Sequence, residues 1–463
     1  MKLTREEMLA NMGSRDASLN GQYIIGVHST GIYCLPSCPA RIPKAENVRF
    51  YENGAEAEAA GLRACKKCKP DAFERGEDRE LDLIERLISR VRANPADFAC
   101  VPDLADSIEV GATKIHELIR THFHTTPGDL LTQARLDRAK TRLLDSDEGI
   151  AQTAYEVGFE SLSVFNENFK KRFGLTPSEY RGLPGTESFT VHLPCGYNVD
   201  RFLRSFGRDS QSPTERVDGR SAVFVTPKGT LVRIEFGDAV RVSIGRGQGV
   251  DAYETLARLL GLSQEPNAFE QLAIDRGFGR LIEGREGARI PQTYSLFDGL
   301  LWAIVGQQIN LPFAFTLRRR LYEKCGEPVG DGFFATPSTV RIANLDSAAL
   351  LPLQFSQRKA EYVVGVAKLG SGWLEAIESM SATRAFQTLT KTRGLGVWST
   401  NYILMRALGF ADCVPYGDTG LTAGLIGLCD LDHKPDLKEI ERLMEPFAPY
   451  RSFATYHLWQ SLK

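Results

Sequence analysis

The sequence lacks a long apolar run, and it lacks a strong charge of one sign. No stretch of about 18 apolar residues occurs among its 463 residues, so we expect no membrane span. Residues 1–7, MKLTREE, are charged, whereas a secretory signal peptide continues into an apolar segment. The formal net charge of −2 gives no global sign of nucleic-acid binding, so any contact with DNA must come from local patches.

Most of the chain also lacks a pattern of paired cysteines. Five of the nine cysteines are scattered, and we interpret them as buried apolar side chains of a protein in a reducing cytoplasm. These five are Cys100, Cys195, Cys325, Cys413 and Cys429. The apolar content of 43% and the charged content of 25% are ordinary for globular protein, and the length suffices for about three or four domains.

The other four cysteines form two closely spaced pairs, C-x3-C and C-x2-C, with 26 residues between the pairs. They are Cys34, Cys38, Cys65 and Cys68. This spacing is typical of a tetrahedral zinc site. Zinc ligation converts each thiol to a thiolate, which is the nucleophilic form of cysteine. The spacing alone leaves two interpretations open: a structural zinc ribbon whose sulfurs never react, and a zinc site with a reactive thiolate.

The residues around these cysteines favour the reactive site. GIYCLPSC at 31–38, ENVRFY at 46–51 and CKKCKPD at 65–71 resemble the N-terminal domain of the Ada-type methyltransferase-activators of the bacterial adaptive response. The resemblance implies a small α/β domain over 1–76 with one Zn²⁺ held by the four cysteines. It implies that Cys34 accepts a methyl group from a methylated DNA phosphate. It also implies contacts with the DNA backbone from Thr30, Arg41 and Lys67.

Residues 77–182 contain an internal repeat. FHTTPGD at 123–129 is echoed by FGLTPSE at 173–179, and before each copy lie a short helix, a glycine turn and a second amphipathic helix. One such helix-turn-helix is weak evidence, because any helical hairpin looks similar. Two copies joined by a helical segment at 135–144 resemble the all-α DNA-binding domain of the AraC type.

Exposed side chains of the second helix in each copy are expected to contact bases in the major groove. In the first copy they are Thr113, Lys114, His116 and Glu117, and in the second copy Ser161, Ser163, Asn166 and Glu167. The alternative for each of them is an ordinary solvated surface. Acidic residues are frequent in the first copy, so base recognition there is expected to be modest.

Leu183–Thr186 has the Pro-Gly composition of a linker, and a β-rich stretch follows it. Four runs have strand character, at 188–193, 221–226, 231–236 and 240–244, and helical sequence resumes at Tyr253. We therefore expect an α+β lobe over 186–283 with no chemistry of its own.

The segment 284–463 contains a glycine hairpin followed by an aspartate. In LTKTRGLGVWSTNY, Gly394 and Gly396 precede a helix, where backbone N–H groups can hold a phosphate. Asp418 comes 22 residues after Gly396, in a loop rich in proline and glycine. Taken alone, a G-x-G sequence is weak evidence, and a lone loop aspartate is usually a turn former or a helix cap.

Together, hairpin, helix and aspartate resemble the helix-hairpin-helix DNA glycosylases, and most of all the AlkA-type (3-methyladenine glycosylase II) branch, over 188–463. The resemblance implies an all-α glycosylase domain in which Asp418 is the catalytic carboxylate. Because an alkylated purine is already a cationic leaving group, one anion near the sugar suffices to stabilise its oxocarbenium character. The candidates for stacking the flipped base are Trp398, Tyr402 and Trp459. Their alternative is core packing.

Three details refine this interpretation. Trp398 stands where related glycosylases with lyase activity carry a Schiff-base lysine, so we predict a monofunctional enzyme that leaves an abasic site. The wedge that fills the gap of the flipped base is either Gln308 or Ile309. The Pro-Cys-His-Arg signature of the guanine-O6 methyltransferase usual in the Ada family is absent, since Cys195 is followed by glycine.

The chain is thus interpreted as a fusion of an alkylation sensor, a transcription activator and an alkylbase glycosylase. Its expected partners are alkylated and promoter double-stranded DNA and RNA polymerase, its expected location is the cytoplasm at the bacterial nucleoid, and no organic cofactor is expected. Two alternatives stay open. One is a pure regulator with a structural zinc module and a non-catalytic domain that binds damaged DNA. The other is a repair enzyme whose middle domain only anchors it to DNA.

Overall fold

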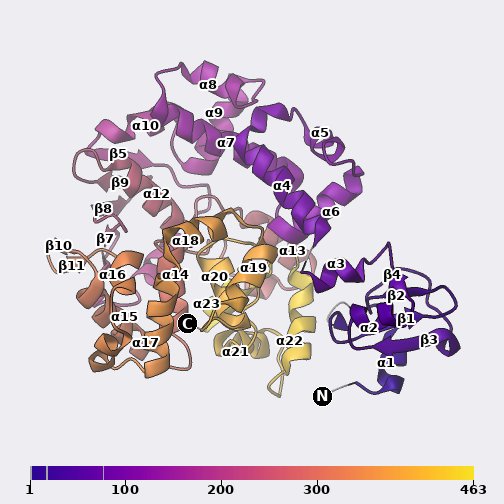
Figure 1. The fold of residues 1–463 in the computed structure, drawn as a ribbon. Helices are drawn as coiled ribbons and strands as arrows, with labels where there is room; N and C mark the ends of the chain where they lie inside the picture. The colour runs from indigo at the N-terminus through magenta and orange to yellow at the C-terminus, as the bar shows by residue number, and fades with distance from the viewer. Residues whose placement is uncertain (1–2, 17–18, 77, 463) are drawn as a thin grey trace. The chain divides into compact units, whose positions relative to one another are not determined.

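The computed structural model describes residues 3–16, 19–76 and 78–462. The chain divides into two compact units, Met1–Arg86 and Leu87–Lys463, whose elements are labelled in Figure 1. In the described part of the chain, no helix has both the length and the apolar character that a membrane crossing requires.

The first unit is a small mixed sheet with short helices, which confirms the predicted α/β zinc domain. Strand β1 pairs antiparallel with β2 and β3, and β2 pairs parallel with β4, in the order β3-β1-β2-β4. The elements are α1 (Arg5–Asn11), β1 (Ile24–Val27), β2 (Ile32–Cys34), β3 (Val48–Tyr51), α2 (Gly54–Ala59), β4 (Arg63–Ala64) and α3 (Pro70–Glu74). Its buried apolar clusters are small. A core of this size usually needs a metal or another cross-link to be stable.

The second unit starts with the predicted pair of helix-turn-helix motifs, α5–α6 and α8–α9, joined by the long helix α7. The repeated Thr-Pro dipeptides turn out to be helix starts, because Thr126 and Thr176 cap α7 and α10 and the prolines occupy their first turns. Gly158 has a φ of +96°, in the turn before α9. The helices are α4 (Arg79–Ala93), α5 (Val101–Asp106), α6 (Ala112–Phe123), α7 (Pro127–Asp145), α8 (Ile150–Glu156), α9 (Leu162–Phe173) and α10 (Pro177–Gly182).

An antiparallel five-stranded sheet follows, in the order β5-β9-β8-β7-β6. The four predicted strands are present, and a fifth, β6, was missed because its sequence ERVD is mostly charged. The elements are β5 (Ser188–Val191), α11 (Val199–Phe206), β6 (Glu215–Asp218), β7 (Ser221–Val225), β8 (Leu231–Phe236), β9 (Val240–Ser243), α12 (Gly249–Leu260) and α13 (Asn267–Asp275).

The second helix-turn-helix pair and this sheet share one hydrophobic core. The Tyr180 ring of α10 packs edge-on against Tyr253 of α12 at 5.5 Å, and the Tyr253 hydroxyl donates a hydrogen bond to the Phe173 carbonyl at 2.7 Å. The prediction of a linker at 183–186 is wrong, because this segment also packs into the shared core. Leu183 is 0% exposed in a 3-10 turn, and Gly249 lies so close to its carbonyl that a Cβ would be 2.1 Å away. The Pro-Gly composition marks a packed turn here.

The remaining helices surround α14, which is mostly apolar, as a central helix is expected to be: nine of its ten residues are buried, Asp298 among them. They run from orange to yellow in Figure 1. The elements are α14 (Leu296–Val305), α15 (Leu311–Cys325), β10 (Pro328–Gly330), β11 (Phe333–Phe334), α16 (Thr339–Ala343), α17 (Gln357–Ala367), α18 (Gly370–Ser379), α19 (Ala382–Lys391), α20 (Val397–Arg406), α21 (Thr419–Leu428), α22 (Leu437–Met444) and α23 (Arg451–Ser461).

Candidate functional site

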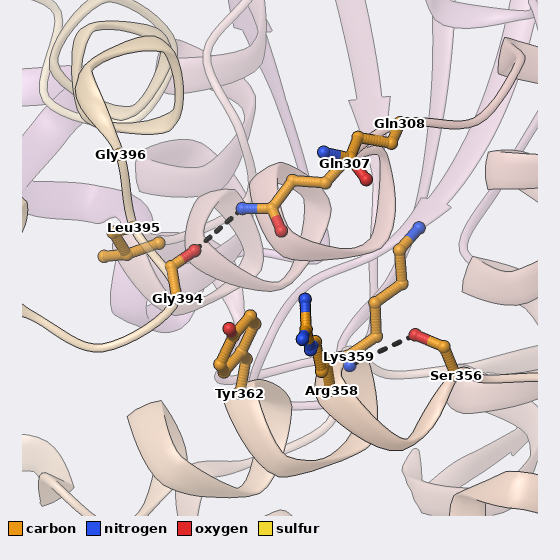
Figure 2. A pocket seen from close by; sticks show the side chains of 9 residues that line it. All are labelled: Gln307, Gln308, Ser356, Arg358, Lys359, Tyr362, Gly394, Leu395 and Gly396. Carbon is orange, nitrogen blue, oxygen red and sulfur yellow. Dashed lines mark hydrogen bonds between the residues drawn. The ribbon is translucent and has the colours of Figure 1, made fainter.

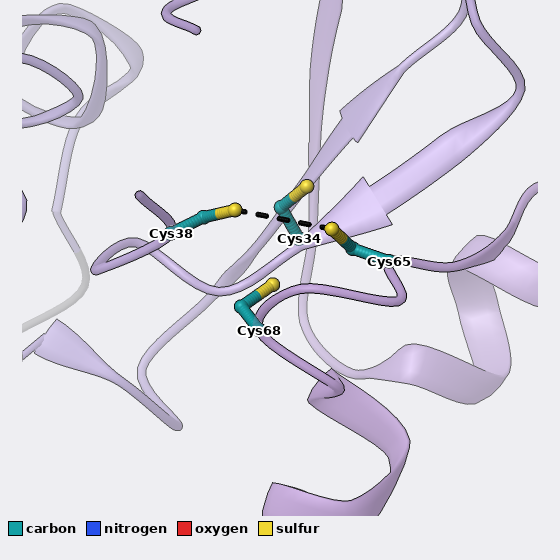
Figure 3. A group of neighbouring side chains, drawn as sticks. All are labelled: Cys34, Cys38, Cys65 and Cys68. Atoms are coloured by element: carbon teal, nitrogen blue, oxygen red, sulfur yellow. Dashed lines mark hydrogen bonds between the residues drawn. The ribbon is translucent and has the colours of Figure 1, made fainter. Parts of the chain in front are cut away.

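The four paired cysteines converge at one end of the first sheet (Figure 3). The register explains why, because Tyr33 of β2 pairs with Ala64 of β4 and each residue is followed by a cysteine, Cys34 and Cys65. Parallel strands bring these two following residues to the same edge. The turn after Cys34 carries Cys38, and the turn before α3 carries Cys68.

The spacing of the sulfurs fits a zinc ion. All four Sγ atoms lie within 4.8 Å of one another, and those of Cys38 and Cys65 are 3.9 Å apart. A tetrahedral site with Zn–S bonds of about 2.3 Å places its sulfurs about 3.8 Å apart. The Leu35 N–H also points at the Cys68 sulfur at 3.4 Å, and such a donor stabilises a thiolate ligand. The predicted single four-cysteine Zn²⁺ site is therefore confirmed.

The electrostatics of the cluster also call for a cation. The pKa of Cys34 is raised, first by its hydrogen bond with Cys38, then by that with Cys68 and by burial, whereas the hydrogen bond from Cys34 lowers the pKa of Cys38. Four thiolates at this spacing would repel one another. A divalent cation among them balances that charge.

The three residues expected to contact the DNA backbone lie on exposed loops of the first unit. Thr30 is in the turn between β1 and β2, Arg41 follows Cys38, and Lys67 lies between the last two cysteines. Cys34 itself is 8% exposed. Arg41 and Lys67 thus follow cluster cysteines closely in the chain, whereas Thr30 lies at the other end of β2 from Cys34.

The predicted contacts of the helix-turn-helix pairs fall into two groups. His116, Ser163 and Asn166 are exposed on the second helices. Lys114 and Ser161 have partners within their own helix, because the Lys114 ammonium lies 3.2 Å from Glu117 and the Ser161 hydroxyl caps α9. The first group is therefore free to meet DNA without breaking a contact.

The glycine hairpin has the geometry that its sequence requires. Gly394 has a φ of +96°, and a Cβ there would lie 2.5 Å from the Tyr362 ring, so only glycine fits. Gly396 is the N-cap residue of α20. The Gln307 side chain donates a hydrogen bond to the Gly394 carbonyl at 2.7 Å (Figure 2). It donates a second to the Ser399 hydroxyl at 3.0 Å. The hairpin and the loop after α14 are thereby fastened together.

A cavity of about 410 Å³ opens between this loop, the hairpin and the start of α17 (Figure 2). Arg358 and Lys359 line it, and sequence reasoning missed both of them, although an Arg-Lys pair at a helix start is a visible signal. The Lys359 ammonium donates to the Val305 carbonyl at 2.6 Å, and burial lowers its pKa. The two wedge candidates differ here: Gln308 is exposed at a φ of +55°, while Ile309 packs against the core.

Asp418 accepts three N–H groups, and it is the N-cap of α21. Its Oδ1 accepts from the Leu421 N–H at 2.8 Å and from the Trp459 indole at 2.8 Å, and its Oδ2 accepts from the Trp398 indole at 3.0 Å. The helix-cap interpretation is therefore confirmed, and the cap places the carboxylate at the positive end of α21. The catalytic role of Asp418 stays a prediction.

The three aromatic candidates form one cluster beside this carboxylate. Trp398 and Tyr402 are stacked, with centroids 5.5 Å apart and planes 22° apart, as their spacing predicts, and Tyr402 lies 6.2 Å from Trp459. Burial raises the pKa of Tyr402, which also has a hydrogen bond with Trp302, a half-buried residue that the sequence analysis missed. The indole contacts with Asp418 could not be foreseen from spacing.

A thiolate-ligated metal centre, a double helix-turn-helix and an aspartate beyond a glycine hairpin define a DNA repair protein with a glycosylase fold. Family models agree with each part. "Metal binding domain of Ada" matches residues 7–71, "Helix-turn-helix domain" matches 104–182, and "HhH-GPD superfamily base excision DNA repair protein" matches 301–449. The predicted class, a DNA-binding repair enzyme of the glycosylase type, is confirmed.

Similar proteins extend this result. The chain is 27% identical to the "Probable bifunctional transcriptional activator/DNA repair enzyme AlkA" of Mycobacterium tuberculosis, over 97% of this chain and 95% of that protein. It is 32% identical to the "Bifunctional transcriptional activator/DNA repair enzyme AdaA" of Bacillus subtilis, over 38% of this chain and 81% of that protein. The chain therefore belongs to the family of Ada-type bifunctional transcriptional activators and DNA repair enzymes.

A solved structure shows the same fold in the glycosylase part. The 3-methyladenine DNA-glycosylase from Archaeoglobus fulgidus superposes with a TM-score of 0.53 at 20% identity, over 58% of this chain and 97% of that protein. The fold of the predicted glycosylase segment is thereby confirmed.

Proposed function

We propose that this protein senses methylated DNA, activates transcription and excises alkylated purines of the 3-methyladenine type. The observation that carries the excision role is the convergence of three N–H donors on the Asp418 carboxylate at the edge of an aromatic cluster. A lone structural cap needs only the donor from its own helix. Two indoles on two other helices hold this carboxylate in one orientation as well, which is what a catalytic anion requires.

The proposed reaction is hydrolysis of the N-glycosidic bond. The flipped purine, cationic after methylation at N3 or N7, stacks on the cluster of Trp398, Tyr402 and Trp459. As the bond from C1′ to the purine nitrogen lengthens, the Asp418 carboxylate stabilises the positive charge that develops on the sugar. Water adds its oxygen to C1′, its proton is released, and the purine leaves as a neutral base. Trp398 has no amine with which to form a Schiff base, so the proposed glycosylase activity is monofunctional: it releases the base without cleaving the DNA strand.

The DNA backbone is proposed to lie along the hairpin. Gly394 and Gly396 offer backbone N–H groups to a phosphate, and the cavity side chains Arg358 and Lys359 add positive charge beside them. Gln308 is the proposed wedge, because it is exposed and points away from the core, whereas Ile309 would have to leave its apolar contacts.

The proposed sensor reaction is methyl transfer to Cys34. Its sulfur attacks the methyl carbon of a DNA methylphosphotriester, the S–C bond forms while the C–O bond breaks, and an ordinary phosphodiester leaves. Zinc held by the four cysteines would keep the sulfur in its thiolate form. Thr30, Arg41 and Lys67 are proposed to hold the backbone on the exposed loops around the cluster.

The helix-turn-helix pairs are proposed to bind promoters and to bring RNA polymerase to them, in the cytoplasm at the nucleoid. The proposed base contacts are Lys114, His116, Ser161, Ser163 and Asn166. The working division of the chain is a methyl-acceptor domain over 1–76, a DNA-binding domain over 77–182, an α+β lobe over 186–283 and a glycosylase domain over 284–463.

Two measurements on the purified chain test the proposal. Free 3-methyladenine is quantified after incubation with methylated DNA, for the wild type and for Asp418→Asn, and release by the wild type alone is expected. If neither protein releases 3-methyladenine, the excision role is rejected and the interpretation as a pure transcriptional regulator is favoured. In parallel, peptide mass spectrometry after exposure to methylphosphotriester DNA is expected to find one added methyl group on Cys34.

A further inference from the structure

The first helix-turn-helix pair touches the loop that leads to Asp418. His124 is the C-cap residue of α6, with a φ of +55°, and its Nδ1 accepts a hydrogen bond from the backbone N–H of Asp412 at 3.2 Å. Its ring also packs edge-on against Phe410, with centroids 5.5 Å apart. Because Asp412 is six residues before Asp418, this contact from the DNA-binding domain falls at the start of the catalytic loop, residues 412–418.

The catalytic loop is attached to α23 at both of its ends. At its start, the Asp412 carboxylate accepts from Nε and Nη2 of Arg451, each at 2.7 Å, and Arg451 is the first residue of α23. At its end, Asp418 accepts from the indole of Trp459, near the other end of the same helix. Asp412 and Asp418 therefore bond to the same helix, so a displacement of Asp412 is expected to change the position of the Asp418 carboxylate as well.

Ser452 of α23 also holds the loop, because its hydroxyl accepts from the Cys413 N–H at 2.9 Å. His124 adds an attachment from outside the glycosylase helices. It satisfies the backbone N–H of Asp412, whose side chain already faces Arg451, so the residue is held on its backbone and on its side chain at once. Burial lowers the pKa of His124 to about 4, against the attraction of the Asp412 carboxylate, so the ring is neutral at neutral pH. The hydrogen bond from the Asp412 N–H then requires the lone pair on Nδ1. The imidazole is thus a permanent acceptor under physiological conditions.

We propose that the first helix-turn-helix pair forms part of the support of the catalytic loop, and that His124 is a positioning residue for Asp418. This inference rests on the proposed base excision and extends it. Excision by this chain depends on its DNA-binding domain for the geometry of the active site, in addition to any help with finding DNA.

The test uses the full-length chain and three variants. His124→Gly keeps the left-handed backbone and removes the acceptor. His124→Asn keeps the left-handed backbone and the acceptor, because asparagine tolerates a positive φ and its Oδ1 takes the place of Nδ1. His122→Ala is the matched control: His122 lies two residues earlier and contacts the Thr383 hydroxyl at 2.9 Å, at the start of α19 and away from the catalytic loop.

The first readout is the single-turnover rate of base release from a duplex with one 7-methylguanine, alongside the Kd for the same duplex. His124→Gly is expected to slow release about tenfold, the scale of a small misplacement of a catalytic group, with Kd changed less than about twofold. His124→Asn and His122→Ala are expected to stay within about twofold of the wild type. Equal rates for His124→Gly and the wild type, or equal slowing by His122→Ala, would overturn the proposal.

The second readout does not need activity. Hydrogen–deuterium exchange over residues 410–418 is expected to be faster in His124→Gly than in the wild type, and unchanged in His124→Asn. Unchanged exchange in His124→Gly would overturn the inference whatever the rates show. A wild type that releases no base, with faster exchange in His124→Gly, would instead reject the proposed excision and keep the loop contact.

Discussion

At the cysteine cluster four sulfurs lie within 4.8 Å of one another in a small sheet, whereas at Asp418 a single carboxylate accepts three N–H groups within a large helical core. Both centres have to hold negative charge in place against alkylated DNA. The first does so with a cation, because its core is too small to fix four charged side chains. The second uses neutral donors that are themselves fixed by packing.

This difference has a chemical consequence. A thiolate that receives a methyl group is consumed, so the cysteine centre acts once and records the damage. A carboxylate that only stabilises charge is unchanged after each cycle, so the proposed excision at Asp418 would turn over. Under the proposed function the same chain carries a signal and a catalyst, and the independence of the two centres can be measured.

The largest effect is expected from removing the metal, which should disrupt the cysteine centre and leave the aspartate centre unchanged. Removing the metal with a chelator, or replacing a ligand by Cys68→Ser, is expected to unfold the first unit, because structural zinc contributes about 10 kcal/mol or more in small domains. Base release by the second unit is expected to stay within about twofold of the untreated protein, since the four-cysteine cluster lies in the first unit. Circular dichroism and exchange over 19–76 monitor the first unit, and a loss of base release would show that the centres are not independent.

The next effect isolates the charge of Asp418. Asp418→Asn is expected to lower the rate of base release about 10²- to 10³-fold, the usual result of removing an electrostatic contact to a transition state. Asparagine can still cap α21 through Oδ1, but its NH₂ group then faces the Trp398 indole N–H, so a modest fall of the thermal midpoint is expected and the rate is compared at a temperature where both proteins are folded. Methyl transfer to Cys34, followed by mass spectrometry, serves as the internal control and should proceed at the rate of the wild type.

The comparison also shows what sequence can and cannot predict. The spacing of the cysteines identified the metal site because ligands must be close together and adjacent in short turns. Asp418 was predicted to be the catalytic carboxylate only with the help of the hairpin, since a lone aspartate in a loop has many uses, and that role stays a prediction. Its two indole donors come from α20 and α23, whose meeting depends on packing across the whole domain.

The fold was predictable where local signals dominate and not where distant segments meet. The Thr-Pro repeats, the glycine turns and the strand pattern produced the expected elements. The 183–186 turn was taken for a linker because composition does not reveal that Leu183 is buried under α12. Arg358 and Lys359 were missed because only the structure places the start of α17 opposite the hairpin.

Acid is expected to weaken the second unit through His457, which is 0% exposed and whose Nδ1 lies 3.3 Å from the Leu281 carbonyl. Burial lowers its pKa from 6.5 to about 4. Between pH 6.5 and about pH 4, His457 is protonated in the unfolded chain and neutral in the folded chain. The free energy of unfolding therefore falls as the pH falls through that window, by about 3 kcal/mol in total. Above pH 6.5 the residue contributes no pH dependence.

Denaturant titrations of the full chain from pH 7 to pH 4 measure this slope for the second unit. His457→Asn keeps a donor for the carbonyl and cannot titrate, so it should be less stable at pH 7 but should lose less stability on acidification. If the free energy of unfolding changes with pH equally in the two proteins, the loss of stability in acid does not come from His457.

The smallest expected effect compares the two indole donors of the aspartate centre. Trp398→Phe and Trp459→Phe each remove one N–H and keep an aromatic ring in the pocket. Oδ1 still accepts from Leu421 when Trp459 is changed, whereas Oδ2 is left without any of its donors when Trp398 is changed. Single-turnover base release should therefore fall about tenfold in Trp398→Phe and less in Trp459→Phe, because a hydrogen bond to a charged group contributes about 1.5–3 kcal/mol. Equal losses would mean that the two indoles act mainly as stacking surfaces, and orientation of the carboxylate would then rest on the helix cap and on the loop that His124 supports.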